Sequence, residues 1–310
     1  MSKALIFPGQ GSQIVGMGKD LFDQYDSARL VFSEVDDALG KKLSSVIFDG
    51  PEKDLLLTEN TQPALMAMSI AIVRVLESRG FKVQDYNFVA GHSLGEYTAL
   101  TAANAISLSD AALALQKRGE LMQKAVPVGE GAMAAIIGLD MANLTSILDR
   151  YSDGVCEIAN YNSPDQIVIS GYKRDVKRVA EEIKTKNLAR SIILPVSAPF
   201  HCSLMQPVAE EMKGVLEVIK INSPIVPLVS NVSALPVVDA EEIKSLLIRQ
   251  IVSVVRWNDI MTFMSGQKIQ DLLEIGSGKV LSGLARRANH GFSVSSVQSV
   301  VDVEKVMKEI

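Results

Sequence analysis

Cysteine is scarce in this chain and long hydrophobic runs are absent. Only Cys156 and Cys202 occur among 310 residues, at no metal-ligand spacing, which leaves no disulfide framework and suits a reducing compartment. No apolar run approaches the ~20 residues that a membrane-spanning helix needs. The apolar start at residues 4–7 is interrupted by Pro8 and Gly9 too early for a signal peptide. We therefore expect a soluble, cytoplasmic protein.

The charge balance is mildly acidic. Lys and Arg total 31 and Asp and Glu total 36, which gives a net charge of −5 and argues against a nucleic acid or an anionic membrane as the main partner. An acidic partner would have to meet a local basic patch. The apolar content of 47% is ordinary for a globular protein and supports one large domain, with or without an insert.

Hydrophobic periodicity predicts an α/β organisation at both ends of the chain. Short apolar runs predict strands at residues 4–7, 86–90 and 271–275. Helical spacing predicts helices at residues 62–78, 94–105, 109–125, 203–218, 241–252 and 280–288. In the helix at 109–125, we expect Ser109 and Asp110 to form the cap and Leu113, Leu121 and Met122 to lie on the apolar face.

A different rhythm follows Pro127. The pattern predicts strands at 132–138, 155–160, 166–171 and 190–196, with helices at 141–151 and 174–186. This β-α-β-β-α-β order is that of a ferredoxin-like unit, which can fold as a discrete subdomain. We therefore predict a large domain made of residues 1–127 and 197–310, a small subdomain of residues 128–196, and a cleft at their junction.

The most informative motif is G-x-S-x-G at residues 91–95 (GHSLG). It lies between a predicted strand and a predicted helix, the context of a nucleophile elbow. Gly91 and Gly95 would allow the strand and the helix to approach closely, while Ser93 is held strained with its hydroxyl exposed. A glycine-bounded turn with a capping serine is the alternative interpretation.

A serine nucleophile needs a base, and the chain has three histidines. His92 adjoins Ser93 in the turn, where neighbouring side chains diverge. His290 lies in a sequence typical of a helix end. His201, in the segment 197–202 just after the small subdomain, is therefore the favoured base, although a lone histidine is as often a core or surface residue.

Several spaced motifs together resemble malonyl-CoA:acyl carrier protein transacylases, from near residue 4 to near residue 287. They are residues 7–13 (FPGQGSQ), 61–64 (TQPA), 91–95 (GHSLG), Arg118, 160–164 (NYNSP), Phe200-His201 and 255–257 (VRW). The resemblance implies a large domain like that of α/β-hydrolases, with a mostly parallel sheet, and a ferredoxin-like small one.

The resemblance also implies roles in a ping-pong malonyl transfer from malonyl-CoA to the phosphopantetheine thiol of an acyl carrier protein. Ser93 would be the nucleophile and His201 the general base and acid. The backbone N–H groups of Gln10 and Leu94 would form the oxyanion hole. The backbone carbonyl of Gln250 would orient His201, in place of the acidic member of a Ser-His-Asp triad. No cofactor and no metal are expected.

Two residues would select the acyl group. By sequence alone, Arg118 is a solvated helix residue paired with a neighbour such as Glu120, whereas the resemblance implies that it grips the malonyl carboxylate. Phe200 would block an α-methyl branch, with ordinary packing as its alternative. Other residues are expected in the cleft or, for the Asn-Ser-Pro segment, in a turn: Gln62, His92, Met122, Asn160, Asn162 and Asn231.

Two other functions use the same residues. A serine hydrolase such as a thioesterase would have the same elbow but would admit water and normally supply an acidic triad member. A non-catalytic carrier-protein binding module would not need both Ser93 and His201. We expect a stand-alone monomeric enzyme, with its acidic carrier protein on a basic patch. The candidate patches are Lys184, Lys186 and Arg190, or Arg286 and Arg287.

Overall fold

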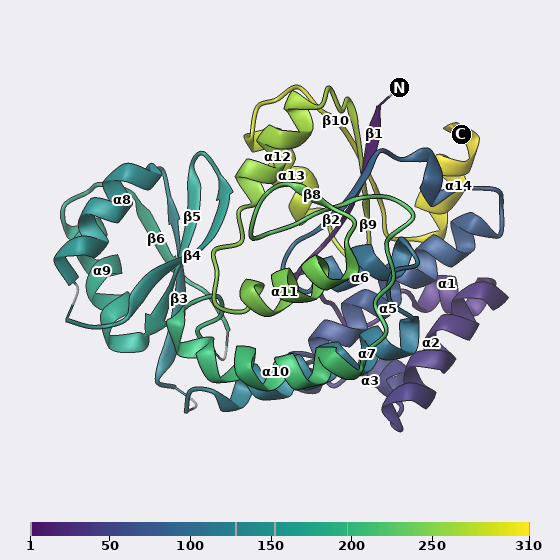
Figure 1. The fold of residues 1–310 in the computed structure, drawn as a ribbon, viewed down its shortest axis with the longest axis horizontal. Coiled ribbons are helices and arrows are strands. Elements are labelled where there is room, and N and C mark those ends of the chain that lie inside the picture. The colour runs from purple at the N-terminus through teal and green to yellow at the C-terminus, as the bar shows by residue number, and fades with distance from the viewer. Residues whose placement is uncertain (1, 128, 152, 197, 310) are drawn as a thin grey trace.

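The computed structural model describes residues 2–127, 129–151, 153–196 and 198–309, which form a larger and a smaller lobe (Figure 1). Both described ends of the chain lie in the larger lobe. The predicted domain boundaries involve Val128 and Ser197, which lie outside the described residues. Ser197 is also the first residue of the segment 197–202, in which the base His201 was predicted.

The larger lobe contains a six-stranded sheet with the order β10-β9-β1-β2-β7-β8. Its strands are β1 (Lys3–Phe7), β2 (Phe88–Gly91), β7 (Leu228–Val229), β8 (Pro236–Val237), β9 (Asp271–Ile275) and β10 (Ser293–Val297). All neighbouring strands are parallel except β7 and β8. The predicted α/β class with a mostly parallel sheet is therefore confirmed.

Alternating residues of β1 pack against helices on opposite faces of this sheet. Leu5 and Phe7 belong to the core cluster formed with α2 (Asp26–Leu39), α5 (Thr58–Glu77) and α7 (Leu108–Lys124). Ala4 and Ile6 belong to the cluster formed with α12 (Trp257–Gly266) and α13 (Val280–Arg287). A parallel strand covered on both faces is apolar at every position, which explains the continuous run at residues 4–7.

The predicted helices are present, with shifted ends. Beyond those named, the large lobe has α6 (Gly95–Ala102), α10 (Gln206–Val218) after the short 3₁₀ turn η3 (Ser203–Met205), and α11 (Ala240–Gln250). The sequence interpretation missed several elements: α1 (Lys19–Gln24), α2, α3 (Leu43–Asp49), α4 (Glu52–Leu55), η1 (Val83–Asp85), α12, α14 (Val300–Glu309) and strands β7, β8 and β10. The two-residue strands and the shortest helices are too brief to give a clear period, so their state depends on tertiary packing. The longer α2 and α14 do carry an amphipathic pattern, which the sequence interpretation overlooked.

Two details of α7 were wrong in the sequence interpretation. The cap is Ser107, whose Oγ accepts a hydrogen bond from the backbone N–H of Asp110 at 3.0 Å. Ser109 instead donates its hydroxyl to Glu34. Leu113 is 45% exposed. It lies outside the apolar face of α7 that packs against α5 and α2, so it does not belong to the predicted stripe.

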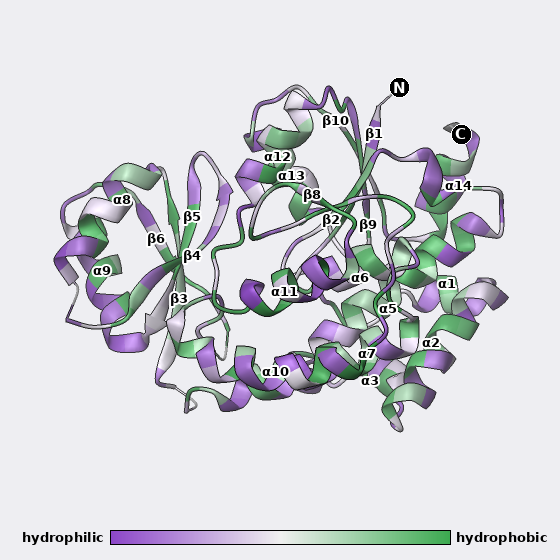
Figure 2. Cartoon of the chain, viewed as in Figure 1, coloured by the Kyte–Doolittle hydropathy of each residue, from purple (hydrophilic) through white to green (hydrophobic). Residues whose placement is uncertain are grey.

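The smaller lobe is a four-stranded antiparallel sheet with the order β4-β5-β3-β6. Its elements are β3 (Gly131–Ile137), α8 (Met141–Leu148), η2 (Asp149–Tyr151), β4 (Cys156–Ser163), β5 (Gln166–Tyr172), α9 (Lys173–Thr185) and β6 (Arg190–Ile193). This is the ferredoxin-like order that the sequence predicts. The apolar face of each helix turns toward the sheet, and α9 presents a polar outer face (Figure 2).

A backbone connection joins the two lobes. In β4, the N–H of Tyr161 donates to the carbonyl of Val255 at 2.9 Å, and the N–H of Val255 donates to the carbonyl of Ala159 at 2.8 Å. The predicted strand extends to Ser163, so Asn160 and Asn162 lie in β4, whereas the turn expected for the Asn-Ser-Pro segment begins at Pro164 and joins β4 to β5. Among the described helices, none is long and apolar enough to cross a bilayer.

Candidate active site

Ser93 lies in the tight turn between β2 and α6, with a left-handed backbone φ of 54°. Only glycine fits at the positions two residues before and two residues after Ser93. A Cβ on Gly91 would lie 1.9 Å from the carbonyl of Gly95, and a Cβ on Gly95 would lie 2.5 Å from the carbonyl oxygen of Phe7. The glycines therefore allow β1, β2 and α6 to meet, and the strained serine projects at the helix N-terminus.

His201 meets Ser93 across 108 residues of sequence. Its Nε2 lies 2.7 Å from Ser93 Oγ, and its Nδ1 lies 2.8 Å from the backbone oxygen of Gln250. Because a carbonyl can only accept, Nδ1 carries the hydrogen and Nε2 is free to accept the serine proton. His201 is 4% exposed and has a φ of 58°. The geometry is that of an activated serine oriented by a neutral acceptor.

The environment keeps His201 neutral. Burial, followed by the positive charge of Arg118, lowers the pKa of His201 to about 3. A neutral imidazole is the form that can accept a proton. At neutral pH His201 is therefore available as a base.

Arg118 reaches the nucleophile from α7. Its Nη2 donates to Ser93 Oγ at 3.1 Å and to Gln250 Oε1 at 2.8 Å, while its Nη1 donates to Gln62 Oε1 at 2.7 Å. The side chain is 1% exposed. The expected surface pair forms instead between Lys117 and Glu120. Burial lowers the pKa of Arg118, yet an arginine stays charged in proteins.

No residue that hydrogen-bonds to Arg118 balances its charge, although the carboxylate of Glu96 attracts it electrostatically. All three hydrogen-bond acceptors named above are neutral. Its buried Nε–H has no hydrogen-bond partner among the described residues. A buried cation with a spare donor is a binding site for an anionic group.

These groups open into a cavity of about 750 Å³. The predicted residues that line it are Gln10, Gln62, His92, Ser93, Leu94, Arg118, Met122, Asn160, Phe200 and His201. Gly11 and Gln13, from the motif at residues 7–13, also line it. Sequence reasoning missed other lining residues: Glu52, Lys53, Leu56, Leu57, Gln123, Met133, Leu194, Pro195 and Val196. Within the described hydrogen bonds, none uses the backbone N–H of Gln10 or Leu94, so both can serve an oxyanion.

Two predicted cleft residues support the site from outside the cavity lining. Asn162 Oδ1 lies 2.9 Å from His92 Nε2, and the His92 ring packs against Trp257. Asn231 is fully buried behind the elbow, where its Oδ1 accepts from the Ser93 N–H at 2.7 Å and its Nδ2 donates to the Gly91 carbonyl at 2.7 Å. Their amides hold the turn from behind.

Sequence reasoning also missed a buried carboxylate. Glu96, three residues after Ser93, is fully buried and accepts from the backbone N–H of Asn231 at 2.6 Å and from Gln250 Nε2. Burial raises the pKa of Glu96 to about 7. The sequence offered one sign of this burial, since Glu96 is a charged residue among mostly apolar neighbours at the start of a helix.

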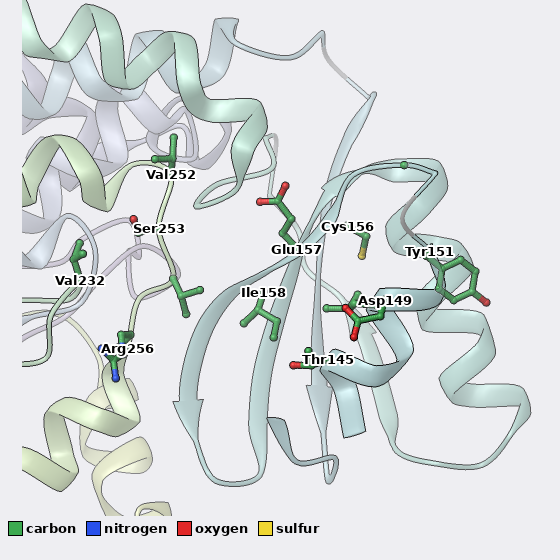
Figure 3. Close-up of a pocket in the computed structure, with 13 residues that line it drawn as sticks. Thr145, Asp149, Tyr151, Cys156, Glu157, Ile158, Val232, Val252, Ser253 and Arg256 are labelled. Carbon is green, nitrogen blue, oxygen red and sulfur yellow. The ribbon is translucent and has the colours of Figure 1, made fainter. Parts of the chain in front are cut away.

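A second hollow, of about 690 Å³, lies where the smaller lobe faces the segment 252–256 (Figure 3). Its labelled walls include Thr145 and Ile158 on one side and Val232 and Arg256 on the other. None of the predicted catalytic residues lines it.

Among the residues that the structure describes, no cluster of three or more His, Cys, Asp or Glu side chains is arranged for a metal ion.

The predicted basic patches lie at the surface. Lys186 is paired with Glu182, whereas Arg190 is exposed on β6, the edge strand that leads to the cavity residues 194–196. Arg286 and Arg287 are exposed at the end of α13.

Comparison with known proteins agrees with this site. Residues 4–282 match the family described as acyl transferase domain. The malonyl CoA-acyl carrier protein transacylase of Bacillus subtilis is 44% identical, with 100% of this chain and 98% of that protein covered. Its namesake in Escherichia coli K12 is 42% identical, with 92% of both chains covered.

Solved structures are equally similar. A crystal structure of acyl-carrier-protein-S-malonyltransferase from Bartonella henselae superposes with a TM-score of 0.97 at 50% identity, covering 100% of this chain and 99% of that one. A malonyl-transacylase in complex with its type II PKS acyl-carrier protein gives 0.96 at 39% identity, with both chains fully covered. The chain belongs to the acyl transferase domain family and groups within it with the malonyl CoA-acyl carrier protein transacylases.

Proposed function

We propose that this protein transfers a malonyl group from malonyl-CoA to the phosphopantetheine thiol of an acyl carrier protein, through a malonyl-serine intermediate. One observation carries the proposal beyond general serine chemistry: the guanidinium of Arg118 lies 3.1 Å from the nucleophile Ser93 Oγ. In a malonyl thioester, the free carboxylate is one methylene from the carbonyl that is attacked. A cation beside the nucleophile therefore lies where that carboxylate would be.

In the first half-reaction, His201 Nε2 takes the proton of Ser93 Oγ as this oxygen attacks the thioester carbonyl. The backbone N–H groups of Gln10 and Leu94 stabilise the oxyanion, and losing one such donor typically costs about 3 kcal/mol. Collapse breaks the C–S bond. The CoA sulfur leaves and takes the proton from His201, so that Ser93 carries the malonyl ester.

The second half-reaction reverses these roles. The phosphopantetheine thiol gives its proton to His201, and its sulfur attacks the ester carbonyl of malonyl-Ser93. The same two N–H groups hold the oxyanion. Collapse then breaks the C–O bond, and Ser93 Oγ recovers the proton from His201.

Arg118 would select carboxylated acyl groups. Its Nε–H and Nη2 lie on one edge of the guanidinium. They can bind both oxygens of a carboxylate once Nη2 gives up its hydrogen bond to Ser93 Oγ. An acetyl group would leave this buried cation without an anionic partner. Phe200, which is nearly buried in the cavity wall, would crowd an α-methyl branch and so favour malonyl over methylmalonyl.

The protein's own residues supply a nucleophile, a base, oxyanion donors and an anion site. We therefore propose that no resident metal or cofactor takes part, malonyl-CoA being a substrate and phosphopantetheine belonging to the partner. We also propose that the enzyme is monomeric and works in the cytosol, where its free thiols Cys156 and Cys202 would stay reduced.

The deciding experiment follows the malonyl group. The protein is incubated with malonyl-CoA, the mass of the Ser93 peptide is measured, and holo acyl carrier protein is then added. We expect a malonyl adduct on Ser93 that moves to the carrier protein, and no adduct on Ser93→Ala. Release of free malonate in place of malonyl carrier protein would identify a hydrolase. Absence of any adduct on a correctly folded protein would refute an acyl-serine mechanism.

A further inference from the structure

The carboxylate of Glu96 is buried within the site but lies outside the lining of the reaction cavity. Its Oε1 accepts from the backbone N–H of Asn231 and its Oε2 from Gln250 Nε2. Burial favours its neutral form, whereas these two donors, the charge of Arg118 and the hydroxyl of Ser230 favour the carboxylate. Burying a carboxylate away from water costs free energy, and buried ionisable groups of this kind are concentrated at functional sites. Glu96 is therefore expected to have a function.

Gln250 connects Glu96 to the reacting groups. Its backbone oxygen accepts from His201 Nδ1 at 2.8 Å. Its side-chain Oε1 accepts from Arg118 Nη2 at 2.8 Å, and its Nε2 donates to the Ser93 carbonyl at 2.9 Å as well as to Glu96. One residue at the end of α11 thus contacts the base, the cation and the elbow.

The amide of Gln250 could in principle be rotated by 180°, which would exchange its oxygen and nitrogen. A carboxylate only accepts hydrogen bonds and a guanidinium only donates them. With Glu96 at one end and Arg118 at the other, only one orientation satisfies both partners. The ionised Glu96 and Arg118, together with the Ser93 carbonyl that also accepts from Nε2, therefore fix the amide. The amide in turn holds Nη2 of Arg118 beside Ser93.

We infer that Glu96 is a positioning residue that locks the Gln250 amide and, through it, places the Arg118 guanidinium that selects a carboxylated acyl group. This inference rests on the proposed function, because it assigns Arg118 to the malonyl carboxylate. Glu96 itself touches no substrate.

The first test is Glu96→Gln. The backbone N–H of Asn231 cannot turn away, so the new amide keeps its oxygen there and presents its NH₂ to Gln250. Gln250 then meets a conflict in either orientation. If it stays, its NH₂ faces the new NH₂, and if it rotates, its NH₂ faces Arg118 and its oxygen faces the Ser93 carbonyl. We expect kcat/KM for malonyl-CoA to fall about tenfold or more, while kcat/KM for acetyl-CoA falls much less.

A fluorophosphonate that labels serine nucleophiles separates this effect from damage to the elbow. The backbone carbonyl of Gln250 remains on His201, so we expect the labelling rate of Ser93 to change far less than malonyl transfer. The matched control is Glu274→Gln. Glu274 is also fully buried, with its carboxylate held by the N–H groups of Leu281 and Ser282, but it lies outside the cavity lining.

We expect the two variants to show similar changes in melting temperature, with the malonyl-over-acetyl preference lost only in Glu96→Gln. A folded Glu96→Gln protein that keeps the wild-type preference would overturn the inference. Should this variant not fold, Gln250→Met decides, because it removes the amide and keeps the helix and its carbonyl. A retained preference in Gln250→Met would overturn the inference as well.

The wild-type protein is measured first. If it takes the fluorophosphonate but no malonyl group, the proposed function fails and the inference fails with it. If it accepts malonyl and both variants keep its preference, only the inference fails.

Discussion

At the scale of single residues, the site depends on charges held out of water. Arg118 and His201 are both almost fully buried, and the charge of Arg118 contributes to the lowered pKa of His201. A malonyl carboxylate bound to Arg118, as proposed above, would offset this charge, raise the pKa of His201 and so make it a stronger base. The substrate would thereby assist the activation of Ser93.

Replacement of Arg118 should change which acyl group is used. In Arg118→Ala we expect kcat/KM for malonyl-CoA to fall about 100-fold or more, because a buried charged contact is lost. Acetyl transfer or hydrolysis should gain relative weight. Steady-state kinetics with both thioesters measure this, and unchanged malonyl kinetics would contradict the role of Arg118.

The lowered pKa of His201 predicts how Ser93 responds to acid. A histidine whose pKa is depressed stays neutral, and able to act as a base, at pH values well below the ordinary 6.5. We expect the fluorophosphonate labelling rate of Ser93 to persist below pH 6.5 and to be lost only nearer the lowered pKa. In Arg118→Met, which keeps bulk and removes charge, the loss should move to higher pH. A wild-type midpoint at pH 6.5 would show that His201 is not buried as described.

The pKa of Glu96 is shifted in the opposite direction from that of His201, and this shift predicts how the stability of the fold depends on pH. Its pKa is raised to about 7 from 4.5, so the folded protein binds this proton more tightly than the unfolded chain does. Between those two pH values the free energy of unfolding contributed by this group falls as pH rises. Relative to Glu96→Gln, the wild-type protein should lose stability from pH 4.5 to 7, as measured by urea unfolding. A constant difference between the two proteins would count against a buried, titrating carboxylate.

At the scale of elements, the junction of β1, β2 and α6 is the point where packing leaves no freedom. In Gly91→Ala the new Cβ would lie 1.9 Å from the Gly95 carbonyl, so the elbow must open. We expect loss of Ser93 labelling together with a destabilisation of about 3 kcal/mol or more. Denaturant unfolding and labelling measure both effects.

Gly214→Ala is the matched control for that substitution. Gly214 lies within α10, and a Cβ there would meet nothing within 4 Å. Because alanine favours a helix over glycine, this variant should be stabilised by about 0.5–1 kcal/mol. If both substitutions had the same effect, close approach at the elbow would not be what requires glycine.

At the scale of the whole molecule, the question is how an acyl carrier protein would reach the cavity that contains Ser93. The lobes are joined by backbone pairing between β4 and Val255, and the cavity takes residues from both. Edge strand β6 carries Arg190 and runs into the cavity wall. A carrier protein docked there would have a short path for its phosphopantetheine.

Charge reversal locates the docking surface. If the carrier protein is acidic and binds beside β6, Arg190→Glu should raise the KM for carrier protein several-fold and weaken its salt dependence, with malonylation of Ser93 by malonyl-CoA unchanged. Arg287→Glu is the comparison, since α13 carries the other basic patch. An effect confined to Arg287→Glu would place docking on α13, and no effect in either variant would exclude both patches.

Much of this architecture could be predicted from local pattern. The apolar run at residues 4–7, the G-x-S-x-G turn and the β-α-β-β-α-β order are properties of neighbouring residues, so they identified the α/β class, the elbow and the ferredoxin-like lobe. The mostly parallel sheet was implied by the resemblance to a known family. Short helices such as α3 and α4, and the two-residue strands β7 and β8, could not be predicted in this way. Their own sequences are too brief to select a conformation without the packing around them.

The sequence by itself determined which chemical groups the site contains, because the serine, the glycines around it and the histidine are fixed by residue type and spacing. Only the tertiary structure decided what these groups experience. It brings His201 to Ser93 across 108 residues, turns Arg118 inward from α7, and places Gln250 between that cation and Glu96. Burial and charge proximity depend on contacts between distant segments, and no local pattern in the chain encodes them.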